Sequence, residues 1–169
     1  MAYISAISAQ ETGDARLAVL LLLRAGEIAE ENKKERVTDK DVLTAKKKVE
    51  EELISELVST LPLHQKAALF ALTFLTKENK GINRFGENAN IFFSGEVYEK
   101  YVEIIENYGK NPVTLRWFKE YIDELETYGL IYTTPSSKGV RGNTTLIKLA
   151  VNENLLEKIL GKEFKTKRA

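Results

Sequence analysis

The chain has 169 residues, of which 43% are hydrophobic and 30% are charged, a composition typical of a globular protein with a buried core. It contains no cysteine, which excludes disulfides and thiolate metal sites, and its longest apolar run, residues 17–23, is too short to cross a membrane. We therefore expect a cytoplasmic protein of one domain or two small ones, with no membrane partner.

The formal net charge of zero is unevenly distributed along the chain. Residues 1–60 carry 9 Lys and Arg against 12 Asp and Glu, whereas residues 61–169 carry 16 against 13. The basic excess lies late, around Lys138, Arg141 and Lys148 and in the tail at 162–169. A local basic patch can bind phosphate even on a neutral chain, although many charged runs only keep a surface hydrated.

The first sixty residues predict helices. The segment from Asp14 to Glu31 is apolar nearly all round its middle, which predicts a buried helix. Thr38 is expected to cap a second helix, with Asp41 in the capping-box position, and helical spacing then continues to Ser59. Pro62 fits the first turn of a new helix, so we expect a domain boundary after residue 60.

The rest of the chain predicts a different order of elements. We expect a core-facing helix over residues 62–79, a loop over 80–90 and a short strand over 91–95. Two helices follow, over 95–109 and 114–129. Two β segments joined by a turn span 130–151, and a short helix over 152–161 is the last element. Gly109 and Gly129 are expected to end the two middle helices, and Thr114 to cap the second of them. This is the order of a winged-helix domain, whose third helix enters the major groove of DNA.

The sequence predicts no catalytic site and no metal site. Gly81 and Gly86 have the spacing of P-loop glycines, but Glu87 stands where the phosphate-binding lysine is needed, and an anion there repels phosphate. His64 is the only histidine, which we interpret as a surface residue near a helix start. We therefore expect no enzymatic activity from this chain.

The helix from Thr114 to Tyr128 is the candidate recognition helix. Arg116 and Lys119 project from it near its N-terminus, where a recognition helix meets bases and phosphates. Helical spacing predicts an inner face of five residues: Phe118, Tyr121, Ile122, Leu125 and Tyr128.

Two features of this helix leave alternatives open. Its later turns are acidic, at Glu120, Asp123, Glu124 and Glu126, which also fits an ordinary amphipathic helix. Trp117 is either half-buried core or an exposed platform that packs on a sugar.

The turn between the two β segments is the candidate wing, from Lys138 to Thr145. Gly139 and Gly142 would let its backbone approach a groove, and Lys138 and Arg141 would reach phosphates or the narrow minor groove. The alternative is a hairpin tip kept soluble by its charges.

Five segments in register resemble the C-terminal half of the archaeal origin-recognition and cell-division-control initiator family, a family of AAA+ replication proteins. They are TGDARLAVLLLLRAGEIAEE, VTDKDVLTA, LPLHQKAAL, GEVYEKY and LETYGLI, and the resemblance covers nearly the whole chain. It implies a mainly α fold: an incomplete helical AAA+ lid at 1–60, a winged-helix DNA-binding domain at 61–161 and a basic tail at 162–169.

The resemblance also assigns a nucleotide-sensing motif, sensor 2, to Gly13, Asp14, Ala15 and Arg16. It implies that Arg16 contacts the terminal phosphates of a nucleotide held by a separate ATPase core, the alternative being an ordinary first-turn helix residue. Nothing in the chain matches a P-loop or an acidic metal-binding strand. We therefore expect a piece of a longer initiator, with no cofactor of its own, whereas the intact protein binds ATP or ADP with Mg²⁺.

The partner that the resemblance implies is double-stranded origin DNA, with the recognition helix in the major groove and the wing on the minor groove or the backbone. The residues expected to contact DNA are Thr114, Arg116, Trp117, Lys119, Lys138, Arg141, Asn143 and Thr144. The wing departs from the family's Gly-Arg-x-Gly-Arg-Thr pattern at Val140 and Asn143, and Trp117 stands where a basic residue is frequent. We therefore expect weaker and less salt-sensitive binding than in a well-matched member, at a cytoplasmic, nucleoid-associated location.

A protein-interaction module is the alternative function. An acidic recognition helix suits docking better than DNA, and Leu17, Leu20 and Leu23 would form an exposed apolar strip where no ATPase core covers the lid. This alternative predicts self-association, or binding to other initiator subunits or the replicative helicase. A winged-helix transcription regulator is a third hypothesis, which the TGDAR motif disfavours.

Overall fold

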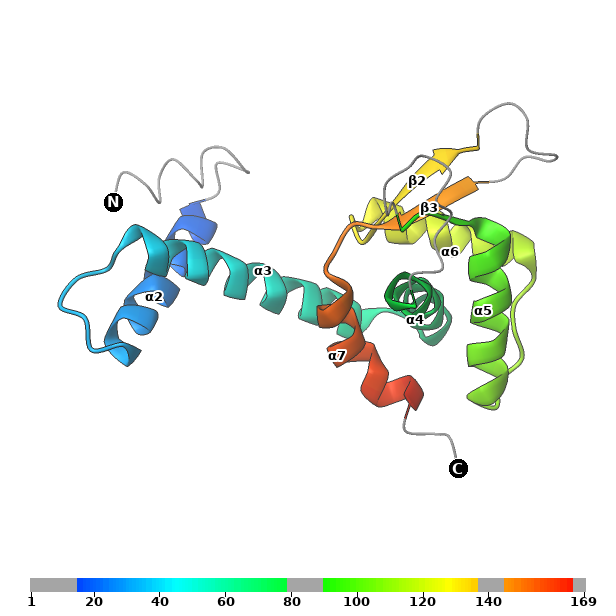
Figure 1. Cartoon of the computed structure of the whole chain (residues 1–169), viewed down its shortest axis with the longest axis horizontal. Coiled ribbons are helices and arrows are strands. Elements are labelled where there is room, and N and C mark those ends of the chain that lie inside the picture. The colour runs from blue at the N-terminus through cyan, green and yellow to red at the C-terminus, as the bar shows by residue number, and fades with distance from the viewer. Residues whose placement is uncertain (1–14, 79–89, 137–144, 166–169) are drawn as a thin grey trace. The chain divides into compact units, whose positions relative to one another are not determined.

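The computed structural model describes residues 15–78, 90–136 and 145–165. Contacts between residues divide the chain into two compact units, Met1–Leu57 and Val58–Ala169. Figure 1 shows their elements, which are mainly helical with one small antiparallel sheet, as the sequence predicts. No helix among the described residues is long and apolar enough to cross a membrane.

The first unit is built from α2 (Ala15–Glu31) and most of α3 (Asp39–Thr60). The two helices bury a small aliphatic core made of Leu21, Ala25, Ile28, Val42, Ala45 and Val49. These residues recur at helical spacing on both helices, so each helix contributes one apolar stripe.

Half of the predicted capping box is present at the start of α3: Asp41 binds the Thr38 N–H, but the N–H of Asp41 donates to the carbonyl of Thr38 and not to its hydroxyl. The buried carboxylate of Asp41 accepts hydrogen bonds from the backbone N–H of Thr38 at 2.9 Å and from its hydroxyl at 2.6 Å. The ammonium of Lys34 lies 2.6 Å from the same carboxylate. The bonds from Lys34 and then from Thr38 lower the pKa of Asp41 to about 2.

The prediction that the first helix is a buried helix rather than a surface one is wrong. One face of α2 packs against α3, whereas Val19 and Leu23 on the other face are 67% and 57% exposed. The reason is that, among the described residues, α2 packs against α3 alone, and a helix with one partner buries only the stripe that faces it.

The second unit has α4 (Leu63–Lys77) at its centre, directly after Pro62. This helix contacts α5 (Ser94–Asn107), α6 (Leu115–Thr127) and α7 (Glu153–Lys165). In Figure 1 it is seen nearly end-on between its neighbours. Three of the positions from 67 to 71 are alanines, and such small side chains let neighbouring helices approach closely.

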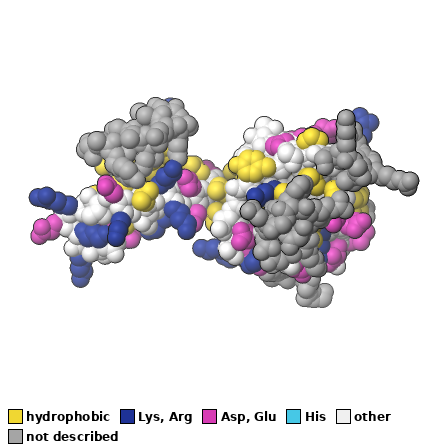
Figure 2. Space-filling model, turned by 45° about the horizontal axis from the view of Figure 1, so that its top comes forward, with side chains coloured by type: hydrophobic (Ala, Val, Ile, Leu, Met, Phe, Trp, Pro, Cys, Tyr) yellow, Lys and Arg dark blue, Asp and Glu magenta, His cyan; other side chains and the backbone are white. Residues whose placement is uncertain are grey.

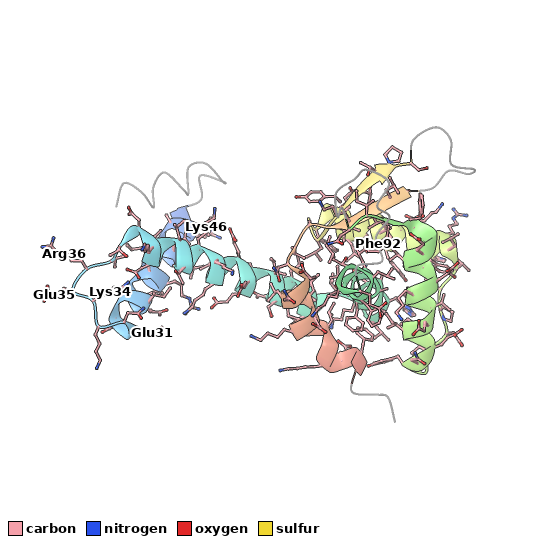
Figure 3. The ribbon with its side chains drawn as sticks, viewed as in Figure 1. Glu31, Lys34, Glu35, Arg36, Lys46 and Phe92 are labelled. Atoms are coloured by element: carbon pink, nitrogen blue, oxygen red, sulfur yellow. The ribbon has the colours of Figure 1, made fainter. Side chains whose placement is uncertain are left out.

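The sheet of this unit has the order β1-β3-β2, with both pairs antiparallel. Its strands are β1 (Phe92–Phe93), β2 (Ile131–Pro135) and β3 (Thr145–Leu149). The alternation of the strands buries Phe92, Ile131 and Ile147 on the inner face. Figure 3 marks Phe92 among the side chains of this core.

Two of the three helices predicted to end at a glycine in the second unit do so, and the third continues past its glycine. Gly109 and Gly129 have positive φ angles of 77° and 71°, so α5 and α6 end in the left-handed turn that glycine adopts without strain. By contrast, α7 continues past the predicted end at Gly161 to Lys165. The ring of Phe164 stacks on Phe70 of α4 at 5.3 Å, a tertiary contact that extends the helix.

Candidate nucleic-acid interface

The segment between α5 and α6 is held by two tyrosines of α5. The hydroxyl of Tyr98 donates a hydrogen bond to the carbonyl of Val113 at 2.8 Å, and the N–H of Val113 donates to the hydroxyl of Tyr101 at 3.1 Å. Both backbone groups of Val113 are therefore satisfied by side chains of the preceding helix. Because Thr114 follows directly and caps α6, these two bonds set where the candidate recognition helix begins.

We call Tyr98 and Tyr101, with their bonds to Val113, the tyrosine clamp. One of its members, Tyr101, also contacts His64 of α4. The hydroxyl of Tyr101 lies 2.7 Å from Nδ1 of His64, and the histidine ring stacks on Tyr121 at a centroid distance of 6.4 Å. The hydroxyl oxygen already accepts the Val113 N–H, so its own proton serves His64 if the imidazole carries its hydrogen on Nε2. Burial raises the pKa of Tyr101. The interpretation of His64 as a surface residue is incomplete, since its side chain is half-buried and its ring joins α4 to α5 and α6.

Aromatic packing fixes the inner face of α6. The ring of Phe118 is fully buried and lies 5.2 Å from Tyr98 and 5.1 Å from Tyr101, measured between centroids. Ile122 and Leu125 are buried on the same face, as predicted. Tyr128 does not join them: it is 46% exposed, because it is the C-cap residue and lies past the last turn that packs on the core.

The first three residues of α6 are exposed, before Phe118 enters the core. They are Leu115, Arg116 and Trp117, with Leu115 exposed by 43% and Trp117 by 61%. The N–H of Trp117 points at the Thr114 hydroxyl over a long 3.5 Å, the only bond that the cap side chain makes among the described residues. Of the two readings of Trp117, the structure supports the exposed one.

Arg116 and Lys119 are exposed, as the helical spacing predicts. Within the part of the chain that the structure describes, neither side chain forms an ion pair. Two cations near the start of an anchored helix are the usual chemistry of phosphate and base-edge contacts.

Two of the four acidic residues that argued against DNA face the protein itself. Glu124 accepts a hydrogen bond from the side-chain amide of Gln65 on α4. Glu126 accepts bonds from the N–H and the hydroxyl of Thr133 on β2, both at 2.7 Å, which ties the end of α6 to the sheet. Both carboxylates keep their negative charge, because their donors are neutral, but these bonds hold them towards α4 and the sheet, whereas Glu120 and Asp123 are exposed on the helix.

The hairpin that would carry the wing is described up to the pair Pro135 and Thr145. The predicted wing residues Lys138, Arg141, Asn143 and Thr144 lie outside the described residues. On the strands below, the exposed Tyr132 lies directly opposite the exposed Lys148. Sequence reasoning did not select Tyr132, although the alternation of buried and exposed residues along β2 would place it outward.

The first unit contributes an exposed arginine and an apolar groove. Arg16 lies in the first turn of α2 with an exposed side chain, while Gly13 and Asp14 fall outside the described residues. The groove, of about 690 Å³, runs between α2 and the loop that leads to α3. It is lined by Val19, Leu22, Leu23 and Val37, with Lys34, Glu35 and Arg36 at its edge.

Figure 2 shows hydrophobic side chains at the surface of this unit beside Lys and Arg, and Figure 3 shows Glu35 and Arg36 projecting from the loop. The predicted apolar strip is present only in part. Leu17 and Leu20 pack against the core, and among its three residues only Leu23 is exposed. No group of described residues in either unit could hold a metal ion.

Comparison with known proteins gives two family matches. Residues 1–47 match the Cdc6 AAA+ ATPase-type lid domain, and residues 56–159 match the C-terminal winged-helix domain of CDC6. The chain is 40% identical over 147 residues to the ORC1-type DNA replication protein of Pyrococcus abyssi, covering 87% of this chain and 33% of that protein. It is 35% identical over 159 residues to ORC1-type DNA replication protein 1 of Aeropyrum pernix, covering 94% and 38%.

A solved structure of the Aeropyrum pernix ORC1 protein in complex with DNA is similar over 99% of this chain and 42% of that one, with a TM-score of 0.80 and 33% identity. The chain thus spans between a third and two fifths of the length of these relatives in sequence. The matched regions are the lid and the winged helix, and the 169 residues do not include the ATPase core.

Proposed function

We propose a function for a chain that belongs to the Cdc6/Orc1 family of DNA replication proteins and carries the lid and winged-helix domain of that family. Its second unit binds double-stranded origin DNA. In this proposal α6 enters the major groove, and the wing between β2 and β3 contacts the minor groove or the backbone. The protein acts as part of a replication initiator at the nucleoid, in the cytoplasm.

The observation that carries the proposal is the first half of α6. Arg116 and Lys119 are exposed there and form no ion pair with any described residue, on a helix whose start is fixed by Tyr98 and Tyr101. A fixed helix costs little ordering entropy when it binds, because its position is set before the partner arrives. The similar Aeropyrum pernix ORC1 structure is itself a complex with DNA, which supports the same partner for this chain.

Each proposed contact follows from side-chain chemistry. Arg116 presents a planar donor fork to a guanine edge or a phosphate, and Lys119 a point charge to a phosphate. Thr114 contacts the backbone at the start of the helix. On the wing, the proposed contacts come from Lys138, Arg141, Asn143 and Thr144.

For the lid we propose that Arg16 senses nucleotide only when an ATPase core is present. An arginine can stabilise the phosphates of ATP or ADP, but a P-loop and a bound Mg²⁺ must first hold them. The described residues supply neither of these. The expected result is that ATP leaves the DNA affinity of this chain unchanged.

The test measures fluorescence anisotropy of a labelled origin duplex and a scrambled duplex at several salt concentrations. The chain should bind the origin duplex more tightly, with affinity falling as salt rises. The double variant Arg116→Glu with Arg141→Glu should lower affinity by more than about a hundredfold, since each reversal replaces an attraction by a repulsion. The matched control, Arg36→Glu with Lys40→Glu, reverses two exposed cations of the first unit and should retain binding.

Absence of binding to both duplexes at low salt would overturn the proposal. So would a charge-reversed α6 and wing that bind as tightly as the unaltered chain. Equal binding to the two duplexes would restrict the proposal to DNA binding without origin specificity.

A second function is favoured by the groove of the first unit. Three neighbouring apolar side chains of α2 are exposed together: Val19, Leu22 and Leu23. Contiguous apolar patches of this kind mark interaction sites, whereas single exposed apolar residues do not. We propose this face as a docking surface for another part of the replication machinery, either initiator subunits or the replicative helicase, or for a second copy of the chain. This function can coexist with DNA binding, because it uses a different unit.

A further inference from the structure

The exposed first turn of α6 carries two large apolar side chains where a DNA-binding helix usually carries polar ones. Leu115 and Trp117 flank Arg116 in the chain, and about 100° of rotation separates each residue from the next. The three side chains therefore leave the helix on different sides of the same turn. A partner that receives this turn must offer a cation-binding group next to apolar surface.

The position of Trp117 separates it from a stray surface residue. Single exposed hydrophobic residues are common on proteins and need no explanation. Trp117, however, lies in the first turn of the helix, between Val113, which two tyrosines bind, and the buried Phe118, so the contacts on both sides hold its backbone in place. Its indole is more than half exposed and beyond the reach of the core that Phe118 fills.

Glu120 narrows the choice of contact for the indole. It is exposed one turn after Trp117 and Arg116, at the i+3 and i+4 positions respectively. A carboxylate there repels the phosphate backbone, which disfavours packing of Trp117 against phosphates and sugars. The base edges carry no net charge and are therefore the better partner for that side of the turn.

Among base edges in the major groove, thymine presents the one apolar group, its C5-methyl, while the other positions present donors and acceptors. The face of an indole is apolar and offers a single N–H donor at its edge. We propose that Trp117 is a specificity-determining residue that packs on a thymine methyl beside the base contacted by Arg116. This inference rests on the proposed DNA-binding function and adds the base class that the helix selects.

The test is a double-mutant cycle between the protein and the DNA. One partner is the chain or its Trp117→Ala variant, and the other is the tightest-binding origin duplex made with thymidine or with deoxyuridine throughout. Deoxyuridine removes only the methyl and keeps every hydrogen-bonding group of the base. The unaltered chain should lose about fourfold in affinity for each methyl contact that is removed, whereas the Trp117→Ala variant should bind both duplexes equally.

Tyr128→Ala is the matched control. Tyr128 is also an exposed aromatic residue, lies on the same side of α6 and is about 16 Å further along the helix axis. Its removal should leave the preference for thymidine unchanged. Because Trp117 is the only tryptophan of the chain, quenching or shifting of its fluorescence on DNA binding supplies an independent readout.

The outcomes separate this inference from the function on which it rests. If the unaltered chain binds both duplexes equally well, the inference is overturned and DNA binding stands. A Trp117→Ala variant that keeps the full preference for thymidine overturns it too, as does one that binds DNA normally but loses a protein partner. If neither duplex is bound at low salt, the proposed function fails together with the inference.

Discussion

The two units of this chain differ in the kind of apolar side chain that fills the core and in how completely the apolar side chains are buried. In the second unit Tyr101, Phe92 and Phe118 are almost fully buried, and they form a core that α4, α5, α6 and the sheet close from several sides. In the first unit the buried core is made of aliphatic side chains between two helices, and further aliphatic side chains of similar size line a groove on the surface. The hydrophobic core of the second unit is enclosed by several elements. In the described part of the first unit, by contrast, no element covers the outer face of α2.

This difference explains how each unit can act. A complete core lets the second unit hold a helix rigidly and place exposed cations on it, which suits recognition of a fixed shape. An uncovered apolar face on a two-helix unit favours association, since covering it removes apolar surface from water. Changes to buried aromatics should therefore affect stability most, and changes to the groove should affect partner binding while stability hardly changes.

The largest expected effect is that of Phe118→Ala. It removes a fully buried ring from between Tyr98 and Tyr101 and should lower the free energy of unfolding of the second unit by about 3 to 5 kcal/mol. Urea denaturation followed by circular dichroism measures the loss. Leu53→Ala, at an exposed leucine of α3 in the first unit, is the control and should change stability by less than about 0.5 kcal/mol. Equal losses from the two variants would contradict the comparison between the units.

Acid should weaken the first unit through Asp41. Its pKa is lowered to about 2 from the usual 3.8, so its carboxylate stabilises the folded state fully above about pH 4. That contribution is lost as the pH falls from 4 through 2, because the protonated carboxyl cannot pair with Lys34. Thermal unfolding of the unaltered chain and of Asp41→Asn should show a melting temperature less dependent on pH in the variant over this range. Asp39→Asn, in the same first turn but exposed, is the control.

Loss of one tyrosine hydroxyl should have a smaller effect on stability and a distinct effect on binding. Tyr98→Phe leaves the partly buried carbonyl of Val113 without its donor, at a cost of about 1 kcal/mol. The same loss frees the start of α6, so DNA affinity should fall while the salt dependence stays constant, since no cation is removed. Tyr132→Phe, at an exposed tyrosine of β2, should leave stability unchanged. A Tyr98→Phe variant with normal stability and affinity would show that the clamp does not position the helix.

Local signals in the sequence predicted much of the fold. Caps and breakers act on their neighbours, so Thr38, Pro62, Gly109 and Gly129 placed helix ends close to where the structure has them. Helical spacing also predicted the exposure of Arg116 and Lys119 and the burial of Phe118, because each depends on the phase of one helix.

What the sequence did not predict depends on contacts between distant residues. His64 was interpreted as exposed, because its bond to Tyr101 joins positions 37 residues apart. The inward roles of Glu124 and Glu126 depend on Gln65 and Thr133, which belong to other elements. The extension of α7 depends on Phe70 in α4. The spacing of residues within one helix gives no information about partners on other elements, so these contacts could be found only from the tertiary structure.

The smallest stability effect is expected at the groove. Val19→Ser with Leu23→Ser should change the free energy of unfolding by less than about 0.5 kcal/mol each, because both side chains are already in water in the folded chain. The same pair should abolish self-association or capture by an initiator subunit, measured by light scattering and by sedimentation of mixtures. Leu43→Ser, at an exposed leucine of α3 that does not line the groove, should leave association intact. If the groove variant associates as well as the unaltered chain, the uncovered face of α2 is not a docking surface, and the contrast between the units concerns stability alone.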